Sequence, residues 1–368
     1  MDVRSSAPDP DPDPDPRSLG PHLASIGRSM VTIGPRRADL APAVRIAASL
    51  AAPLVILLLT GHVQWSLFAS FGAFTSIYAR YVPTATRLRH HATVGLLLTI
   101  CVGVGALIAQ LAAAGVLGGA VHLGLTTVIG ALAAAIGSVI VMSRGMRPTG
   151  AVFPVFATTA VASAPSVAPF WLALLIAGAS ALWCVVLGFL ARWTGEANPD
   201  AALPETVGIT GAMRRQEFSR YGFAALVSGI IAAATGIPSP YWAQVAAVVP
   251  LSAPGRRLQV ERGLHRIVGT ALGVGVTAFL LSFPSQPWQL LVWVILFQFL
   301  AEMFVLRNYS LALVFITPLA LLMVQLANPR PVGALLAARV SETAIGAVVG
   351  IGSVLLAVAL ERRRRSRD

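Results

Sequence analysis

Residues 92–112 read ATVGLLLTICVGVGALIAQLA and contain no charged side chain. A helix needs roughly 20 apolar residues to cross a hydrocarbon core about 30 Å thick, so this stretch is long enough to span a membrane. The rest of the chain has a similar character: 56% of its 368 residues are hydrophobic and only 11% are charged. A soluble domain carries about 25% charged residues. The composition therefore predicts an all-α, polytopic membrane protein and excludes an ordinary water-soluble enzyme.

Hydropathy and helix-breaking residues divide the chain into about twelve apolar segments in two sets of six. The segments are residues 43–60, 65–79, 92–112, 120–142, 149–164 and 169–191, then 220–236, 241–254, 267–283, 287–306, 309–327 and 334–360. The second, fifth, eighth and eleventh are shorter than a full span or interrupted, for example at Pro154 and Pro318. The prediction is a helical bundle of about twelve transmembrane helices.

The distribution of positive charge supports this count. All 27 basic residues are arginine, the net charge is +12, and the arginines gather in every second loop. Because positive residues mark the cytoplasmic side, we expect both termini to be cytoplasmic and the protein to lie in the inner (plasma) membrane. The expected parts are a disordered tail with DPDPDPDP at 9–16 (residues 1–42), a first six-helix half (43–192), a cytoplasmic linker (193–219), a second half (220–360) and a basic tail (361–368).

Landmarks recur in the same order in the two halves. Arg45 lies fifteen residues before Thr60, and Arg220 lies fifteen residues before Thr235; a Gly, a nearby Trp and a short span follow in both cases. Six spans are an even number, so both halves point the same way across the membrane. The pattern predicts two parallel six-helix repeats, an arrangement found in many transporters.

The second half resembles the FUSC family, the group of fusaric acid resistance and aromatic acid exporter proteins. The resemblance rests on PYWAQVAAVVPL (240–251), RGLHRIVGTALG (262–273), RNYSLALVFITPLALL (307–322) and ARVSETAIGA (338–347). It implies an inner-membrane exporter of aromatic carboxylic acids and related small anions. It also implies a distant similarity to plant malate-type anion channels.

Ionisable residues inside a span are costly, by some scales about 2.5–3.5 kcal/mol each at the helix centre, and are therefore functional candidates. Arg339 and Glu342 lie three residues apart in the last segment, on one helix face. Arg339 offers a planar fork for a carboxylate, and Glu342 offers a site for a coupling proton. The alternative is a structural ion pair that orients the helix. Glu302 is a further candidate, with an interfacial residue as its alternative.

Uncharged polar residues add to the candidate pathway. Thr317 and Pro318 in the eleventh segment, and Thr158 beside Pro154 in the fifth, mark expected helix breaks, which are tolerated at membrane depth only against protein or a watery cavity. Tyr241, Trp242 and Gln244 open the eighth segment and could stack on and hydrogen-bond an aromatic substrate. The alternative for the two aromatic residues is a belt at the outer membrane interface.

The sequence favours no enzyme, cofactor or metal site, because no catalytic cluster or metal-ligand spacing is found. Cys101 and Cys184 lie in separate apolar segments and predict neither a disulfide nor a metal site. The expected partners are a small organic anion and the lipid bilayer, without nucleic acid, and a homo-oligomer is left open. The expected function is proton-coupled export of small organic anions. The alternatives are a passive anion channel and a non-transporting envelope structural or assembly protein.

Overall fold

The computed structural model describes residues 27, 30, 32–34, 39–196, 209–237 and 239–365, without the side chains of Arg256 and of residues 357–365. Nearly all of the predicted disordered tail, the middle of the predicted linker and the end of the basic tail lie outside the described residues. Within them the chain is all-helical and forms no strand.

Every expected apolar segment contains a helix or, for residues 65–79, a run of short helices. The elements are α2 (Leu40–Leu59), η2 (Val63–Trp65), α3 (Ser66–Ala73), η3 (Phe74–Ile77), α4 (Thr84–Ala113), α5 (Gly119–Ser143), α6 (Val152–Ala162), α7 (Phe170–Leu190), η4 (Ala191–Trp193), α8 (Gly211–Ala234), α9 (Tyr241–Leu251), α10 (Arg256–Leu281), α11 (Pro287–Phe304), α12 (Tyr309–Ala327) and α13 (Val332–Arg365).

Eight of the described helices are long and apolar enough to cross a membrane, so the predicted count of twelve spans is not confirmed. Four predicted segments are not among these eight: α8, which has 24 residues but is not apolar enough, and α3, α6 and α9, which have 8, 11 and 11 residues. At a rise of 1.5 Å per residue, the longest of the three short helices covers only about 16 Å. Every residue of α3 and of α9 is buried. These short helices are therefore enclosed by protein, which explains their apolar composition without a membrane crossing.

Neither expected helix break is present. Pro318 lies inside a continuous α12, and Pro154 lies in the first turn of α6, where a missing N–H breaks no intrahelical bond. The predicted segments 241–254 and 267–283 leave the basic residues 256–266 in a loop between them, but α10 already begins at Arg256. The arginines among them therefore belong to the helix, and Arg266 is buried inside the protein.

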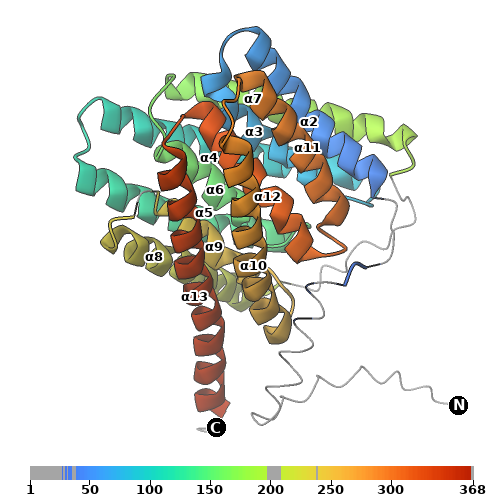
Figure 1. Cartoon of the computed structure of the whole chain (residues 1–368). Coiled ribbons are helices and arrows are strands. Elements are labelled where there is room, and N and C mark those ends of the chain that lie inside the picture. The colour runs from blue at the N-terminus through green and yellow to red at the C-terminus, as the bar shows by residue number, and fades with distance from the viewer. Residues whose placement is uncertain are drawn as a thin grey trace, which may run out of the picture.

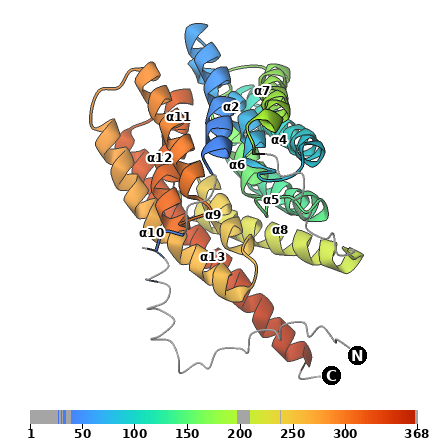
Figure 2. The ribbon, with the colours of Figure 1, turned by 90° about the vertical axis from the view of Figure 1, so that its right-hand side faces the viewer.

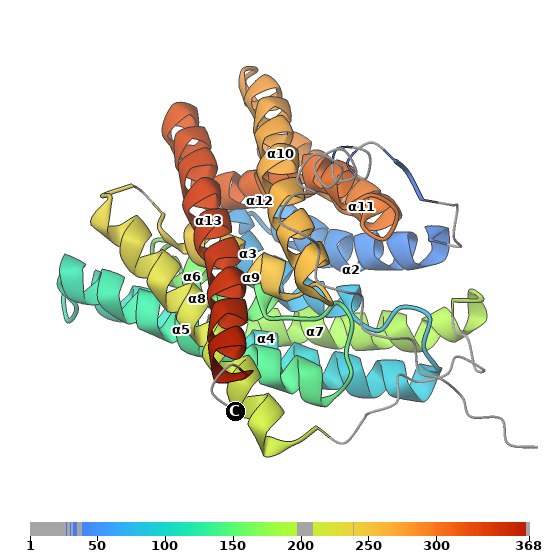
Figure 3. The same cartoon turned by 90° about the horizontal axis from the view of Figure 1, so that it is seen from below.

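The helices of the two halves form two sets that meet around α9. In Figure 2, α10, α11, α12 and α13 lie on one side and α4 to α7 on the other. In the view of Figure 3, α10 and α13 cross the direction of α4 and α7. Figure 1 shows α11 beside α2 at the edge where the two sets meet.

The same pairs of positions pack together in both halves. Helix α3 packs on α7 as α9 packs on α13, and α4 packs on α6 as α10 packs on α12. Contacts between the halves are reciprocal: α5 meets α8 while α11 meets α2, and α6 meets α9 while α12 meets α3. Corresponding helices thus have corresponding neighbours.

Glycines allow α13 to approach the backbone of α9. A Cβ added at Gly346 would lie 2.3 Å from the Ala243 carbonyl oxygen, and one at Gly350 would lie 2.6 Å from the Ala247 carbonyl oxygen. Because these neighbours are backbone atoms of a buried helix, they cannot move aside cheaply. This close packing is the small-residue contact typical of membrane helices.

We therefore expect Gly346→Ala to lower the stability of the protein by about 1–3 kcal/mol, the usual cost of overpacking. Gly352→Ala is the matched control, because it lies on the same helix and an added Cβ there meets nothing within 4 Å. Thermal unfolding of both variants in detergent measures the difference. Equal unfolding temperatures for the two variants would contradict the close α9–α13 contact.

Candidate functional site

One face of α13 carries three polar residues into the protein interior. Arg339, Glu342 and Thr343 are spaced i, i+3 and i+4, so they lie on the same side of the helix. Arg339 is 2% exposed and Glu342 is 0% exposed. Gly346, one turn further along, holds this side of α13 against α9. The sequence spacing thus predicted which residues share this face.

Trp242, in the first turn of α9, lies against the arginine. The guanidinium carbon of Arg339 is 3.9 Å from the centre of the Trp242 ring, a cation–π contact. Trp242 is 1% exposed, and its ring lies 4.7 Å from that of Phe156 on α6. The alternative of an aromatic belt at the membrane interface is therefore wrong for Trp242, and also for Tyr241, which is buried beside it.

Several buried polar atoms around this contact have no hydrogen-bond partner. They include Nε and Nη1 of Arg339 and both carboxylate oxygens of Glu342. We call the residues with such atoms on α9, α10, α12 and α13 the polar cluster: Trp242, Arg266, Thr270, Thr317, Arg339, Glu342 and Thr343.

The energetics of the polar cluster favour a bound group. A buried polar atom without a partner costs about 1–3 kcal/mol, and a charged one costs more. The Glu342 carboxylate lacks the direct ion pair with Arg339 that the sequence left open as an alternative. The backbone amide of Trp242 lies near this carboxylate, and the N-terminal end of a helix favours negative charge. The cluster therefore offers buried donors and acceptors to which a polar or charged group could bind.

Helices α10 and α12 complete the polar cluster through another glycine contact. A Cβ added at Gly273 would lie 2.6 Å from the Thr317 Cβ, so Thr317 packs directly on α10. Thr270 lies one turn before Gly273, and Arg266 one turn before Thr270. Arg266 is not among the predicted site residues, because the charge run 256–266 was interpreted as a loop. The i, i+4 spacing of Arg266 and Thr270 was the available signal.

A cavity of about 310 Å³ opens beside the start of α13. Its lining includes Phe283 after α10, Gln325 on α12 and Val332 at the first position of α13. Val332 precedes Arg339 by seven residues, which is about 10 Å along the helix. The cavity therefore ends within about two turns of the polar cluster.

The polar cluster does not include the predicted site residues Gln244, Thr158 and Pro318. Gln244 donates from Nε2 to the backbone oxygens of Thr127 on α5, at 2.8 Å, and Ala225 on α8, at 3.1 Å. It therefore connects three helices. Thr158 donates to the Pro154 carbonyl within its own helix, at 2.9 Å. Pro318 follows Thr317 directly and is buried on α12.

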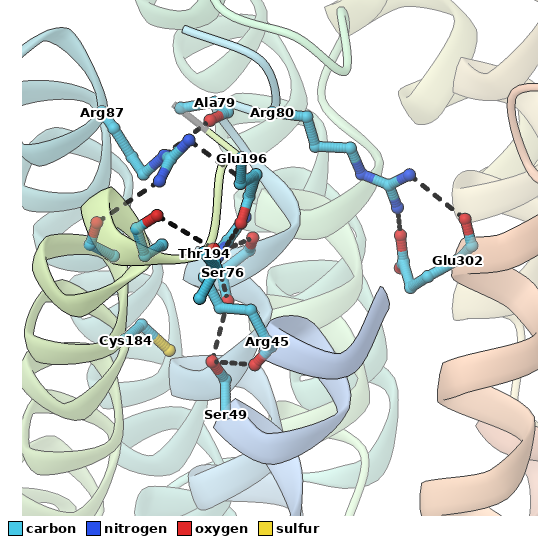
Figure 4. Close-up of polar contacts among 12 residues, drawn as sticks. Arg45, Ser49, Ser76, Ala79, Arg80, Arg87, Cys184, Thr194, Glu196 and Glu302 are labelled. Carbon is cyan, nitrogen blue, oxygen red and sulfur yellow. Dashed lines mark hydrogen bonds and ion pairs between the residues drawn. The ribbon is translucent and has the colours of Figure 1, made fainter. Parts of the chain in front are cut away.

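Glu302 takes part in an ion pair between the halves. Its carboxylate pairs with Arg80, which follows η3, and accepts a hydrogen bond from Gln298 at 2.7 Å. Arg80 also donates to the Glu302 backbone oxygen at 3.1 Å (Figure 4). Burial lowers the pKa of Arg80 to about 10, which still leaves the guanidinium charged at neutral pH. The interfacial alternative for Glu302 does not fit this buried position.

A second buried network connects Glu196, in the segment that follows η4, to α2 and α4. Glu196 forms two hydrogen bonds of 2.8 Å with Arg45 on α2 and lies 3.5 Å from Arg87 on α4. Arg45 also donates to the Ser76 hydroxyl at 2.7 Å (Figure 4). The Glu196 carboxylate lies between two guanidinium groups and is paired with both. We therefore interpret this network as structural: it holds the segment that leads into the linker against α2 and α4. These residues lie far apart in the sequence, so no local sequence pattern predicted their contact.

The cysteines and the metal-ligand types form no site in the described residues. Cys101 and Cys184 are free and buried in α4 and α7. No group of three His, Cys, Asp or Glu side chains suited to a metal ion is found in the described part of the chain.

The polar cluster falls within the part of the chain that has known relatives. Residues 226–352 match the family model described as fusaric acid resistance protein-like. This segment is FUSC-like. The FUSC-like segment contains the end of α8 (residues 226–234), α9 to α12 and the part of α13 with Arg339 and Glu342, so the family resemblance predicted from the sequence motifs is confirmed there.

Two curated relatives match parts of the chain. An uncharacterized membrane protein of Bacillus subtilis (strain 168), YvaC, is 28% identical over 139 residues, covering 37% of this chain and 22% of the relative. An uncharacterized protein of Synechocystis is 32% identical over 134 residues, covering 36% of this chain and 18% of the relative. The chain thus matches about a fifth of each relative. No solved structure matches the chain. Together with the apolar helices, these similarities support a multi-pass membrane protein.

Proposed function

We propose that the protein exports small organic anions, in particular aromatic carboxylic acids, across the plasma membrane, with both termini in the cytoplasm. The observation that carries this proposal is the contact between Arg339 and Trp242 in the FUSC-like segment, beside a carboxylate that has no partner. A guanidinium can hold a carboxylate through two hydrogen bonds. The Trp242 ring is suited to stacking on the aromatic part of the same molecule.

Glu342 is the residue proposed to couple transport to protons. Its side chain lies in the same cluster as the arginine, so its charge acts directly on an anion bound there. Protonation of Glu342 and binding of the anion are therefore linked, and linkage is reciprocal for binding free energies. Thr317 would form part of the wall of the substrate site, together with the next residue of α12, Pro318.

The closed state of the polar cluster requires a movement for transport. We propose that the two halves are repeats and that the pathway opens when they move relative to one another, as in other transporters built from repeats. The reciprocal packing of α5 on α8 and α11 on α2 supports this proposal. The cavity near the start of α13 would then be the entrance or exit closest to the cluster.

The test is transport by purified protein in liposomes. Radiolabelled benzoate and fusaric acid serve as probes, and a pH gradient or a membrane potential is imposed in either direction. We expect protein-dependent accumulation of both acids under a pH gradient, and its loss in Arg339→Gln. Arg215→Gln, on an exposed turn of α8, is the control and should transport normally.

The results separate the three functions. Accumulation driven by the pH gradient supports a coupled transporter, and the effective direction of the gradient gives the direction of coupling. Flux driven by the membrane potential but not by the pH gradient would replace the proposal with an anion channel. No flux of either acid, with Arg339→Gln equal to wild type, would favour a non-transporting envelope protein.

A further inference from the structure

One ring contact of Trp242 comes from the other half of the protein. Phe156, on α6, is 6% exposed, and its ring centre lies 4.7 Å from that of Trp242, with the two ring planes tilted by 44°. It also lies 6.4 Å from the ring of Tyr241. Helix α6 meets α9 where the two sets of helices come together (Figure 2). Phe156 therefore brings a side chain of the first half to the polar cluster, although it lies outside the FUSC-like segment.

The Phe156 ring is supported by the first half. Its centre lies 4.9 Å from that of the Phe71 ring on α3, in an edge-to-face arrangement. This is one of the preferred geometries of aromatic pairs, and Phe71 is itself 0% exposed. Helix α3 packs on α7, and α6 packs on α4 and α5. Because these supports all belong to the first half, Phe156 moves with that half.

An aromatic ring can reach Trp242 only if one of its present neighbours moves away. Trp242 is 1% exposed, and the described side chains with ring or cation–π contacts to it are Tyr241, Phe156 and Arg339. Tyr241 precedes Trp242 on α9, and Arg339 lies on α13, which packs closely on α9 through Gly346. These two residues stay beside Trp242 when the halves move apart. Phe156 is the neighbour that such a movement withdraws.

We propose that the ring of the substrate takes the place of Phe156 beside Trp242, and that Phe156 thereby sets the size of the aromatic group that the site accepts. The carboxylate of the same molecule then reaches Arg339, which contacts the Trp242 ring. The space that Phe156 leaves is that of one six-membered ring. A single-ring acid fills it, whereas a two-ring acid needs a larger withdrawal of Phe156. This inference rests on the proposed function and names a residue that determines its specificity.

Shortening Phe156 should change which acids bind. Phe156→Ala removes the ring and leaves apolar space beside Trp242, and an engineered apolar cavity can bind an aromatic molecule. We expect the ratio of 2-naphthoate affinity to benzoate affinity to rise by about tenfold or more, because a single methylene group in an apolar pocket already changes discrimination by about 10–200-fold. Phe156→Leu removes less of the side chain and should give a smaller rise of the same ratio.

Phe153→Ala is the matched control. Phe153 lies three residues before Phe156 on α6, and its ring contacts those of Phe74, at 5.3 Å, and Tyr78, at 5.8 Å, within the first half. The substitution deletes the same atoms from the same helix, so a general loosening of α6 would affect both variants. The affinity ratio of Phe153→Ala should remain that of wild type.

Isothermal titration of the purified full chain in detergent measures the two affinities. Competition of 2-naphthoate with benzoate for uptake into liposomes measures the same preference during transport. The ratio is the informative quantity, because loss of folded protein lowers the binding of both acids together. Size-exclusion chromatography checks folding, and Phe156→Leu decides the test if Phe156→Ala does not fold.

The outcomes separate this inference from the proposed function. If wild type neither binds nor transports either acid, the proposed function fails and the inference fails with it. If wild type binds benzoate but the Phe156 variants keep its affinity ratio, or Phe153→Ala shifts the ratio equally, Phe156 does not set the ring size while the proposed function stands. A higher ratio in the Phe156 variants, with an unchanged ratio in Phe153→Ala, is the result that the inference requires.

Discussion

Glu342→Gln is expected to abolish accumulation of benzoate driven by a pH gradient while downhill flux of benzoate continues. Glutamine keeps the size of the side chain but takes up no proton near neutral pH, so binding of the anion can no longer be linked to protonation at this position. The buried carboxylate without a partner is the reason to place the coupling proton here. Uptake into proteoliposomes with and without an imposed pH gradient measures the effect.

Glu217→Gln provides the control for this variant. Glu217 lies on α8, outside the polar cluster, and its carboxylate pairs with Arg220 on the same helix. Its replacement removes a carboxylate without altering the polar cluster, so it should leave the response to the pH gradient intact. Full accumulation by Glu342→Gln would show that the coupling proton is carried elsewhere.

The second large effect concerns the ion pair between the halves. Glu302→Gln leaves the charge of Arg80 buried and uncompensated, which typically costs 3–5 kcal/mol. We expect a clear drop in the thermal unfolding temperature for Glu302→Gln and for Arg80→Gln. The double variant should lose less than the sum of the two, because both charges are then removed.

A double-mutant cycle on these variants measures the coupling between Arg80 and Glu302. Transport rates provide a second readout: if the halves must separate to open the pathway, weakening this contact should change the rate even in variants that remain folded. Glu217→Gln is the control, because its pair with Arg220 lies within one helix and is more exposed. Additive effects of the two single changes would exclude a significant interaction between the halves at this point.

The sequence predicted the helical elements and one face of the site well. Apolar composition and turn residues located the segments, and the spacing of Arg339 and Glu342 placed them on one side of a helix. Helix formation and the spacing of side chains around a helix depend on residues close together in the sequence. They do not depend on what packs against the helix, so these predictions hold in the folded protein.

The errors came from properties that depend on the surroundings of a residue. An apolar segment is equally suited to lipid and to the interior of a protein, so α9 was counted as a span although every one of its residues is enclosed by protein. An interfacial belt stayed open as the alternative for Trp242 because its position at the start of a segment does not reveal Phe156 or Arg339 beside it. Arg266 was assigned to a loop because charge runs usually are exposed, whereas here α10 carries it inward.

The central claim is that the polar cluster on α9, α10, α12 and α13 binds an aromatic acid. A structure of the full chain with 4-bromobenzoate tests it most directly, because anomalous scattering locates the bromine independently of any other density. The account predicts the carboxylate within hydrogen-bonding distance of Arg339 and the ring beside Trp242. Bromine found only outside this cluster, with Arg339 paired directly to Glu342, would contradict it.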